Sequence, residues 1–133
     1  MDRKEYAVNI KHTRGNCAQA VLLAFAKELD LPEETLKNLG AAFGGGMGCL
    51  EATCGALCGA EMVLGLTMAG DRPVSRDAAA MHRAFAERCG ASLCKDLKGR
   101  DTGVVLCECD DCVRHAVEIT EEMLEAAGRI QTC

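Results

Sequence analysis

The sequence predicts an all-α fold: a compact single-domain bundle of about five to six helices around a central helix rich in small residues. Hydrophobic residues make up 49% of the chain, with no Trp, one Tyr and three Phe. The core must therefore be built from small and aliphatic side chains, which suit close-packed helices. Apolar residues recur at helical spacing, and the alternation typical of strands is nearly absent. A length of 133 residues fits one domain, residues 1–133.

The N-terminal third of the chain predicts three helices. Arg3 to His12 forms the first, short helix. Asn16 is suited to cap the second, which we expect to span Cys17 to Leu29 with its apolar residues on one face. A third helix is expected to begin near Pro32 and to run to about Ala42, with carboxylates in its first turn.

A glycine-rich run and a buried helix follow. The run from Gly44 to Gly48 contains four glycines and is too costly in backbone entropy to lie inside a helix, so we expect a loop with special backbone angles. The stretch from about Leu50 to Ala69 predicts the central helix. Within it, Gly55-x-x-x-Gly59 forms a strip of small residues that another backbone can approach closely.

The C-terminal half predicts two longer helices and a short one. Ser75 is expected to cap a helix that runs to about Arg88, and Gly90 ends it. A brief helical turn is expected at Cys94 to Leu97. The last helix spans roughly Asp110 to Ala127.

Charge and patterning exclude several classes of protein. The net charge is −5, and the 15 basic residues are scattered, so no stripe exists to neutralise successive phosphates of a nucleic acid. Met1 to Thr13 lacks the apolar segment of a secretory signal, which predicts a cytoplasmic location. The stretch from Ala52 to Ala69 is interrupted by polar residues and glycines, so no membrane insertion is expected.

Ten cysteines dominate the candidate chemistry. In a protein that stays in the reducing cytosol, this number indicates metal binding or redox chemistry rather than a disulfide framework. The densest group is Cys107-x-Cys109-x-x-Cys112, whose close spacing lets several thiolates converge on one metal or cluster. The alternative is that these cysteines are small core residues.

Two further patterns suggest thiol chemistry. Cys109 and Cys112 form a C-x-x-C pair beside a helix start, although the acidic residues between them oppose thiolate formation. Cys54 and Cys58 are four residues apart on the central helix and so share one face, but Cys58 fits a core role better than a ligand role. Cys17 lies at a predicted helix start, as does Cys94, where the helix dipole favours thiolate.

Several segments together resemble the C_GCAxxG_C_C family of redox-active proteins, over about residues 5–127. They are Asn16–Val21, Phe43–Gly48, Cys54–Gly59, Cys94 and a late cysteine before a helix. The resemblance assigns the four family cysteines to Cys17, Cys54, Cys94 and Cys109. It implies a small helical protein with a redox role and an association with a transporter, because such proteins are often encoded near transporter genes. The sequence departs from the family pattern by six additional cysteines: Cys49, Cys58, Cys89, Cys107, Cys112 and Cys133.

The leading hypothesis is that the four family cysteines, Cys17, Cys54, Cys94 and Cys109, bind one iron–sulfur cluster or another metal for electron transfer or redox sensing. Further candidate metal ligands are Cys107, Cys112 and Cys58. One alternative is a thiol–disulfide oxidoreductase that uses Cys109 with Cys112 or Cys54 with Cys94. The other is a structural zinc-binding module. The expected partners are a redox protein or a small-molecule thiol, with a homodimer through the glycine-rich helix face as a further interaction.

Overall fold

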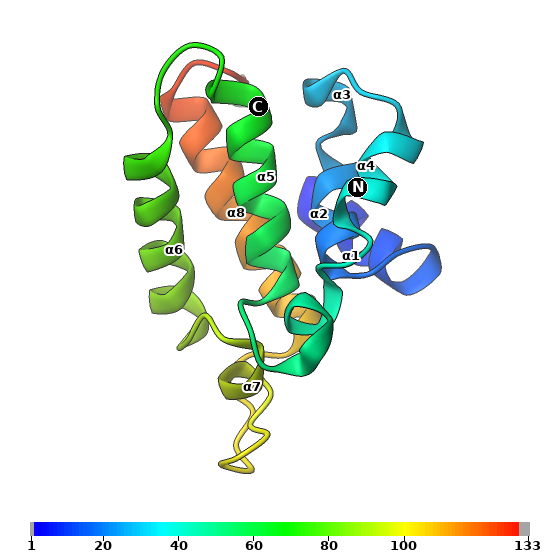
Figure 1. Cartoon of the computed structure of the whole chain (residues 1–133), viewed down its shortest axis with the longest axis vertical. Coiled ribbons are helices and arrows are strands. Elements are labelled where there is room, and N and C mark those ends of the chain that lie inside the picture. Colours follow the sequence, from blue (N-terminus) through cyan, green and yellow to red (C-terminus); the bar gives the residue numbers. More distant parts are fainter. Residues whose placement is uncertain (1, 131–133) are drawn as a thin grey trace.

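The computed structural model describes residues 2–130 and contains helices without strands (Figure 1). This confirms the all-α prediction. Six helices have eight residues or more: α1 (Arg3–Thr13), α2 (Cys17–Ala24), α4 (Glu33–Gly40), α5 (Gly55–Met68), α6 (Ser75–Cys89) and α8 (Cys109–Ala126). Two single-turn helices, α3 (Ala26–Leu29) and α7 (Cys94–Leu97), and a wide π-type turn, η1 (Gly46–Leu50), connect them.

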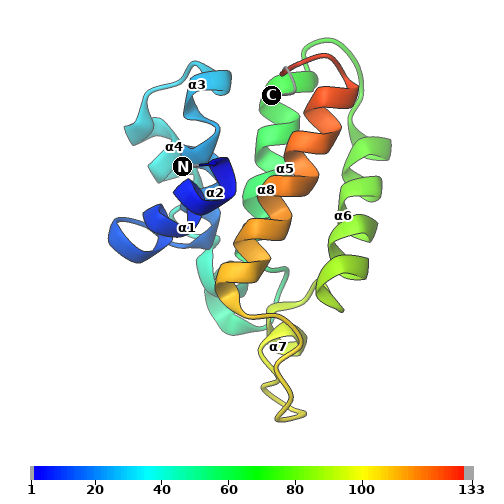
Figure 2. The same ribbon diagram turned by 180° about the vertical axis from the view of Figure 1, so that it is seen from behind.

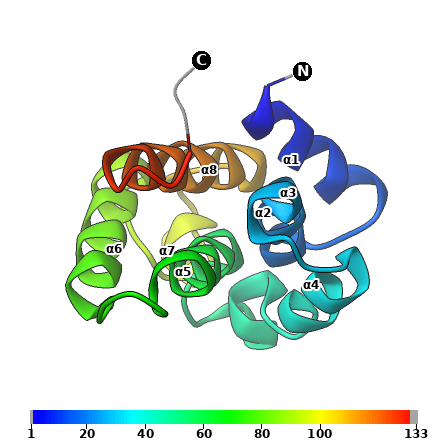
Figure 3. The same cartoon turned by 90° about the horizontal axis from the view of Figure 1, so that it is seen from above.

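Helix α5 lies in the middle of the bundle, as the small residues of its sequence predict. It packs against α2, α6 and α8, and α1 covers α2 and α8 on the outside (Figure 3). Figure 2 shows from behind that α8 runs beside α5 along most of its length. The buried residues form one cluster that includes Phe25, Leu57, Phe85 and Val117. None of the helices within residues 2–130 combines the length and apolar character needed to cross a membrane.

The glycine strip of α5 brings α2 unusually close. A Cβ atom on Gly59 would lie 2.7 Å from the carbonyl oxygen of Ala18 and 3.1 Å from Cβ of Val21, so only glycine fits this crossing. The strip is therefore used inside the chain. It is not free to contact a second copy, which removes the reason for expecting a homodimer through this face.

The predicted helix from Cys17 to Leu29 is broken at Phe25. The backbone of Phe25 leaves the helical region (φ −108°, ψ 14°), and its N–H donates to the carbonyl of Leu22 at 3.2 Å, three residues back. This change of direction buries the Phe25 ring completely, and the Arg3 guanidinium lies 4.5 Å from the ring centroid. Burial of a large aromatic ring therefore outweighs the continuous helical pattern of the sequence.

The predicted central helix from Leu50 begins at Gly55 instead. The residues before it are extended because they pair with a distant segment: the N–H of Cys54 donates to Ser92 at 2.9 Å, and the N–H of Cys94 donates to Ala52 at 2.8 Å. Cys54 therefore precedes the helix, and the prediction that it shares a helix face with Cys58 is wrong. The pairing also places Cys54 and Cys94 side by side.

The start of α6 differs from the sequence prediction by one residue. Ser75 is the first helical residue, and Val74 occupies the cap position without a side-chain hydrogen bond. The predicted end of the helix is confirmed, because Gly90 adopts a left-handed conformation (φ 95°) directly after Cys89. The backbone turns sharply there, which places Cys89 close to the segment before α8.

Candidate metal centre

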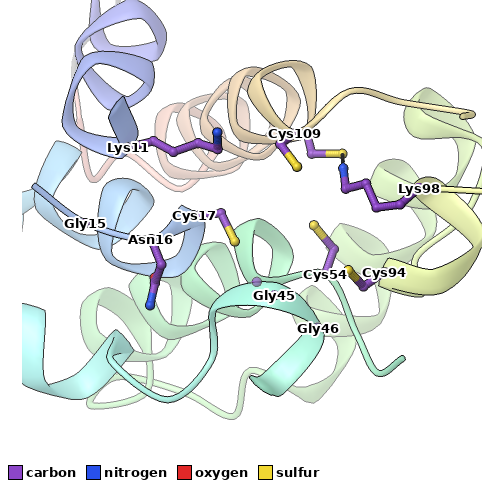
Figure 4. Close-up of a pocket in the computed structure, with 12 residues that line it drawn as sticks. Lys11, Gly15, Asn16, Cys17, Gly45, Gly46, Cys54, Cys94, Lys98 and Cys109 are labelled. Carbon is purple, nitrogen blue, oxygen red and sulfur yellow. Dashed lines mark hydrogen bonds between the residues drawn. The ribbon is translucent and has the colours of Figure 1, made fainter. Parts of the chain in front are cut away.

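A pocket of about 310 Å³ lies where the first turns of several helices meet. Five cysteines line it. Cys112 lies one turn into α8, and the other four are Cys17 at the start of α2, Cys54 directly before α5, Cys94 at the start of α7 and Cys109 at the start of α8. These are the four family cysteines of the sequence analysis, and we call them the signature cysteines and the space between them the signature pocket. Figure 4 shows their side chains arranged around this space.

Asn16 fixes the position of Cys17. Its side-chain oxygen accepts a hydrogen bond from the N–H of Gln19 at 2.8 Å, and the N–H of Asn16 donates to the side-chain oxygen of Gln19, which forms a capping box. The Asn16 amide also donates to the carbonyls of Gly40 and Ala41. The start of α2 is thus tied to the end of α4, and Asn16 acts as the cap that the sequence predicts.

Glycines allow the segments of the pocket to come together. A Cβ atom on Gly55 would lie 2.5 Å from Sγ of Cys17, and one on Gly46 would lie 2.5 Å from Cβ of Cys94. Gly45 and Gly46 both have positive φ values near 60°, as expected for a segment with special backbone angles. The backbone of Gly45 lowers the pKa of Cys17, although the larger effect of burial raises it, so this turn favours negative charge on the sulfur.

Two lysines contribute positive charge. The ammonium group of Lys98 lies 3.6 Å from Sγ of Cys112 and donates to the carbonyl of Cys107 at 3.1 Å. Lys11 also lines the pocket, where it forms an ion pair with Asp110 at 3.0 Å. Among residues 2–130, Lys98 has no carboxylate partner, so its charge faces sulfur and carbonyl groups.

Burial raises the pKa of the pocket thiols. The pKa of Cys17 and that of Cys94 are both above the ordinary range, chiefly because the thiolate would lose hydration. The pKa of Cys54 is raised further by its hydrogen bond with Cys112 and by burial. The expectation that helix starts favour thiolate at Cys17 and Cys94 is therefore wrong, because desolvation outweighs the helix dipole. A metal ion would deprotonate these thiols on binding.

A second group of thiols lies beside the pocket. The sulfur atoms of Cys89, Cys107 and Cys112 all lie within 4.8 Å of one another, and all three residues are buried. We call this group the buried trio; its geometry allows it to hold a metal ion. Cys112 also lines the signature pocket, so the two groups adjoin. No role for Cys89 is predicted from the sequence, because its partners are 18 and 23 residues away and nothing in their spacing indicates the contact.

The predicted convergence of Cys107, Cys109 and Cys112 on one centre is only partly found. Cys109 and Cys112 line the signature pocket, three residues apart on α8, whereas Cys107 precedes the helix and, with Cys112, belongs to the buried trio. Cys58 does not line the pocket; its thiol lies 3.8 Å from the Thr53 carbonyl, and burial raises its pKa to about 11.

The remaining cysteines lie outside both groups. Cys49 is exposed and donates to the carbonyl of Gly46 at 3.3 Å. Cys133 lies outside the described residues. All nine cysteines between residues 2 and 130 are free thiols. None of the chemistry proposed below therefore requires a disulfide to be broken first.

The chain is similar to one protein family and to one protein of an archaeon. The family model described as "Putative redox-active protein (C_GCAxxG_C_C)" matches residues 15–123, which include all four signature cysteines and the buried trio. An uncharacterized protein of Archaeoglobus fulgidus is 30% identical over 141 residues, which cover 92% of this chain and 93% of that protein. No solved structure matches the chain.

Proposed function

The chain belongs to the C_GCAxxG_C_C family of redox-active proteins, and from this premise we propose that its four signature cysteines bind one iron–sulfur cluster. The protein would then serve in electron transfer or redox sensing. The observation that carries the proposal is that Cys17, Cys54, Cys94 and Cys109, which come from four separate segments, line one pocket. Four cysteine thiolates are the ordinary ligand set of such clusters.

The spacing of these thiols favours a cluster over a single ion. Four thiolates on one tetrahedral zinc ion, each at about 2.3 Å, stand about 3.8 Å apart. Within residues 2–130, no three of the four signature sulfur atoms lie within 4.8 Å of one another. A cluster places several iron atoms between its ligands and therefore suits more widely separated sulfur atoms. When bound, it would supply one-electron redox chemistry.

The surroundings of the pocket suit an anionic cluster. Four thiolates give the bound group a negative charge, and the ammonium group of Lys98, which pairs with no carboxylate among residues 2–130, lies in the pocket wall and stabilises that charge. The backbone of Gly45 favours the thiolate form of Cys17, and backbone groups near sulfur tune cluster potentials. Cys109 is exposed, so one edge of the cluster would face the solvent, where an electron partner can approach.

Anaerobic purification of the full chain, followed by iron, sulfide and zinc analysis and a visible spectrum, tests the proposal. We expect iron and acid-labile sulfide in stoichiometric amounts, with charge-transfer absorption that bleaches on reduction. Zinc without iron or sulfide, in an amount that falls in the variant Cys17→Ser/Cys94→Ser, would instead support the structural module. Two exchangeable thiols without metal would support a thiol–disulfide oxidoreductase.

The thiol–disulfide alternative has one feature in its favour: Cys54 and Cys112 both line the pocket, and each thiol alters the pKa of the other. This pair differs from the two pairs expected from the sequence. The raised pKa of Cys54 argues against it as an attacking nucleophile, because thiolate is the reactive form. We therefore rank this alternative below cluster binding.

The partners follow from the proposed function. A redox protein or a small-molecule thiol would exchange electrons with the cluster in the cytoplasm, and no nucleic acid is involved. Association with a transporter is a proposal that comes from the family resemblance alone. An electron partner would approach at the exposed edge of the pocket, beside Cys109.

Lys98→Gln is expected to lower the reduction potential of the cluster by on the order of 50 to 100 mV, because the positive charge stabilises the reduced, more negative state. The matched control is Lys27→Gln, which removes the same charge from exposed α3, at the opposite end of the molecule from α7 (Figure 1). Solvent screens that charge, so its potential should stay near that of the wild type. Redox titration of the visible spectrum measures both. Equal shifts in the two variants would contradict the role of Lys98.

A further inference from the structure

The buried trio lies outside the set of signature cysteines. Cys89 is the last residue of α6, Cys107 lies in the turn before α8, and Cys112 lies in the first turn of α8. Their exposed fractions are 3%, 8% and 1%. Cysteine alone also serves as a small core residue, so burial by itself does not indicate a ligand role.

The backbone around the trio holds the three sulfur atoms together. The carbonyl of Leu97 accepts hydrogen bonds from the N–H groups of Leu106 at 2.9 Å and Cys107 at 3.3 Å, which fixes the turn before α8. The side chain of Leu106 packs on the position of Gly90, directly after Cys89. The end of α6 and the start of α8 are thereby brought together without a bond between the sulfur atoms.

The half-buried ammonium group of Lys98 distinguishes this trio from ordinary core thiols. It lies 3.6 Å from the sulfur of Cys112, donates to the carbonyl of Cys107, and pairs with no carboxylate among the described residues. A partly buried cation is stabilised by a negative charge close to it. Here the nearest groups able to acquire one are the sulfur atoms.

We propose that Cys89, Cys107 and Cys112 bind one Zn²⁺ ion, separately from the cluster in the signature pocket. Three sulfur donors select a soft or borderline ion over Mg²⁺ or Ca²⁺. Their separations, all within 4.8 Å, are close to the spacing of about 3.8 Å between thiolates on one zinc ion. The three thiols release their protons to solvent on binding, and a water molecule completes the coordination.

Charge balance selects Zn²⁺ over Cu⁺. Three thiolates with Zn²⁺ carry a single net negative charge, and the Lys98 ammonium, which lies 3.6 Å from Cys112 between the trio and the signature pocket, offsets part of it. Cu⁺ in the same place would leave two negative charges against one lysine in a buried site, and uncompensated buried charge is costly. The zinc ion would tie α6 to α8 beside the signature pocket, so its role would be to stabilise that wall of the pocket.

The test starts from the double variant Cys17→Ser/Cys94→Ser, which disables the signature pocket and leaves the trio intact. We expect this protein to bind one Zn²⁺ per chain in a chelator competition, and Co²⁺ in its place to give cobalt–thiolate absorption. Adding Cys89→Ser should weaken zinc binding about a hundredfold or more. Adding Cys58→Ser, a half-buried cysteine outside both groups, should leave the affinity unchanged.

Cys107→Ser provides a second variant, and far-UV circular dichroism checks that helix content is retained in each protein. If the double variant binds no zinc, or if Cys58→Ser weakens binding as much as Cys89→Ser and Cys107→Ser do, the trio is not a zinc site. This outcome does not depend on the proposed iron–sulfur cluster, whose failure would appear as absence of iron and sulfide in the wild-type protein.

Discussion

Cys54→Ser is expected to reduce the iron and sulfide content of the anaerobically purified protein at least about tenfold. Cys54 is a buried signature cysteine that lines the pocket, and a serine hydroxyl is a much poorer ligand for iron in a cluster than a soft thiolate. Serine has nearly the size of cysteine, so the fold should be kept. Iron and sulfide per chain, together with the visible spectrum, measure the effect.

Cys49→Ser is the matched control. Cys49 lies five residues before Cys54 in the sequence but is exposed, and its thiol donates to the carbonyl of Gly46 without lining the pocket. Its replacement should leave the iron content unchanged. The assignment of ligands fails if Cys54→Ser retains iron at the wild-type level with an unaltered spectrum, or if both variants lose iron equally.

The sequence predicts most of the fold because the helices carry local signals. Apolar spacing, the cap at Asn16 and the breaks at glycine depend on neighbours within a few residues, and the structure confirms them. The segment before α5 was predicted as helix because its composition is apolar. Its extended form depends on two hydrogen bonds: Cys54 donates to Ser92, and Cys94 donates to Ala52. These partners are about 40 residues apart in the sequence, so the local spacing of apolar residues does not indicate the pairing.

The candidate site was predictable to a similar degree. The four signature cysteines carry a family pattern, and the glycines that allow their approach lie within the same motif. Lys98 and Cys89 carry no such signal, because their importance arises only where α6, α7 and α8 meet. The direction in which the pKa values of the pocket thiols shift could not be predicted from the sequence either. A helix start is visible in a sequence, whereas the degree of burial that overrides its dipole is a property of the folded protein.

Gly55→Ala is expected to lower the free energy of unfolding by about 1 to 3 kcal/mol and also to reduce the iron content. The added methyl group would lie 2.5 Å from Sγ of Cys17 and 2.7 Å from the carbonyl oxygen of Phe43, so the first turn of α2 must move. That movement displaces a signature thiol. Denaturant unfolding and iron analysis of the same preparation measure the two effects.

Gly65→Ala is the control in the same helix. A Cβ atom at Gly65 would meet nothing within 4 Å, so alanine should stabilise α5 by about 0.5 to 1 kcal/mol through its higher helix propensity. Gly59→Ala distinguishes the effect of helix packing on stability from the effect of the Cys17 position on iron binding. Its methyl group would meet the carbonyl of Ala18, one helical turn beyond Gly55, so it should lower stability with a smaller loss of iron. If Gly55→Ala lowers stability but binds iron like Gly65→Ala, close packing of α2 on α5 is needed for folding alone, and the position of Cys17 does not control the metal centre.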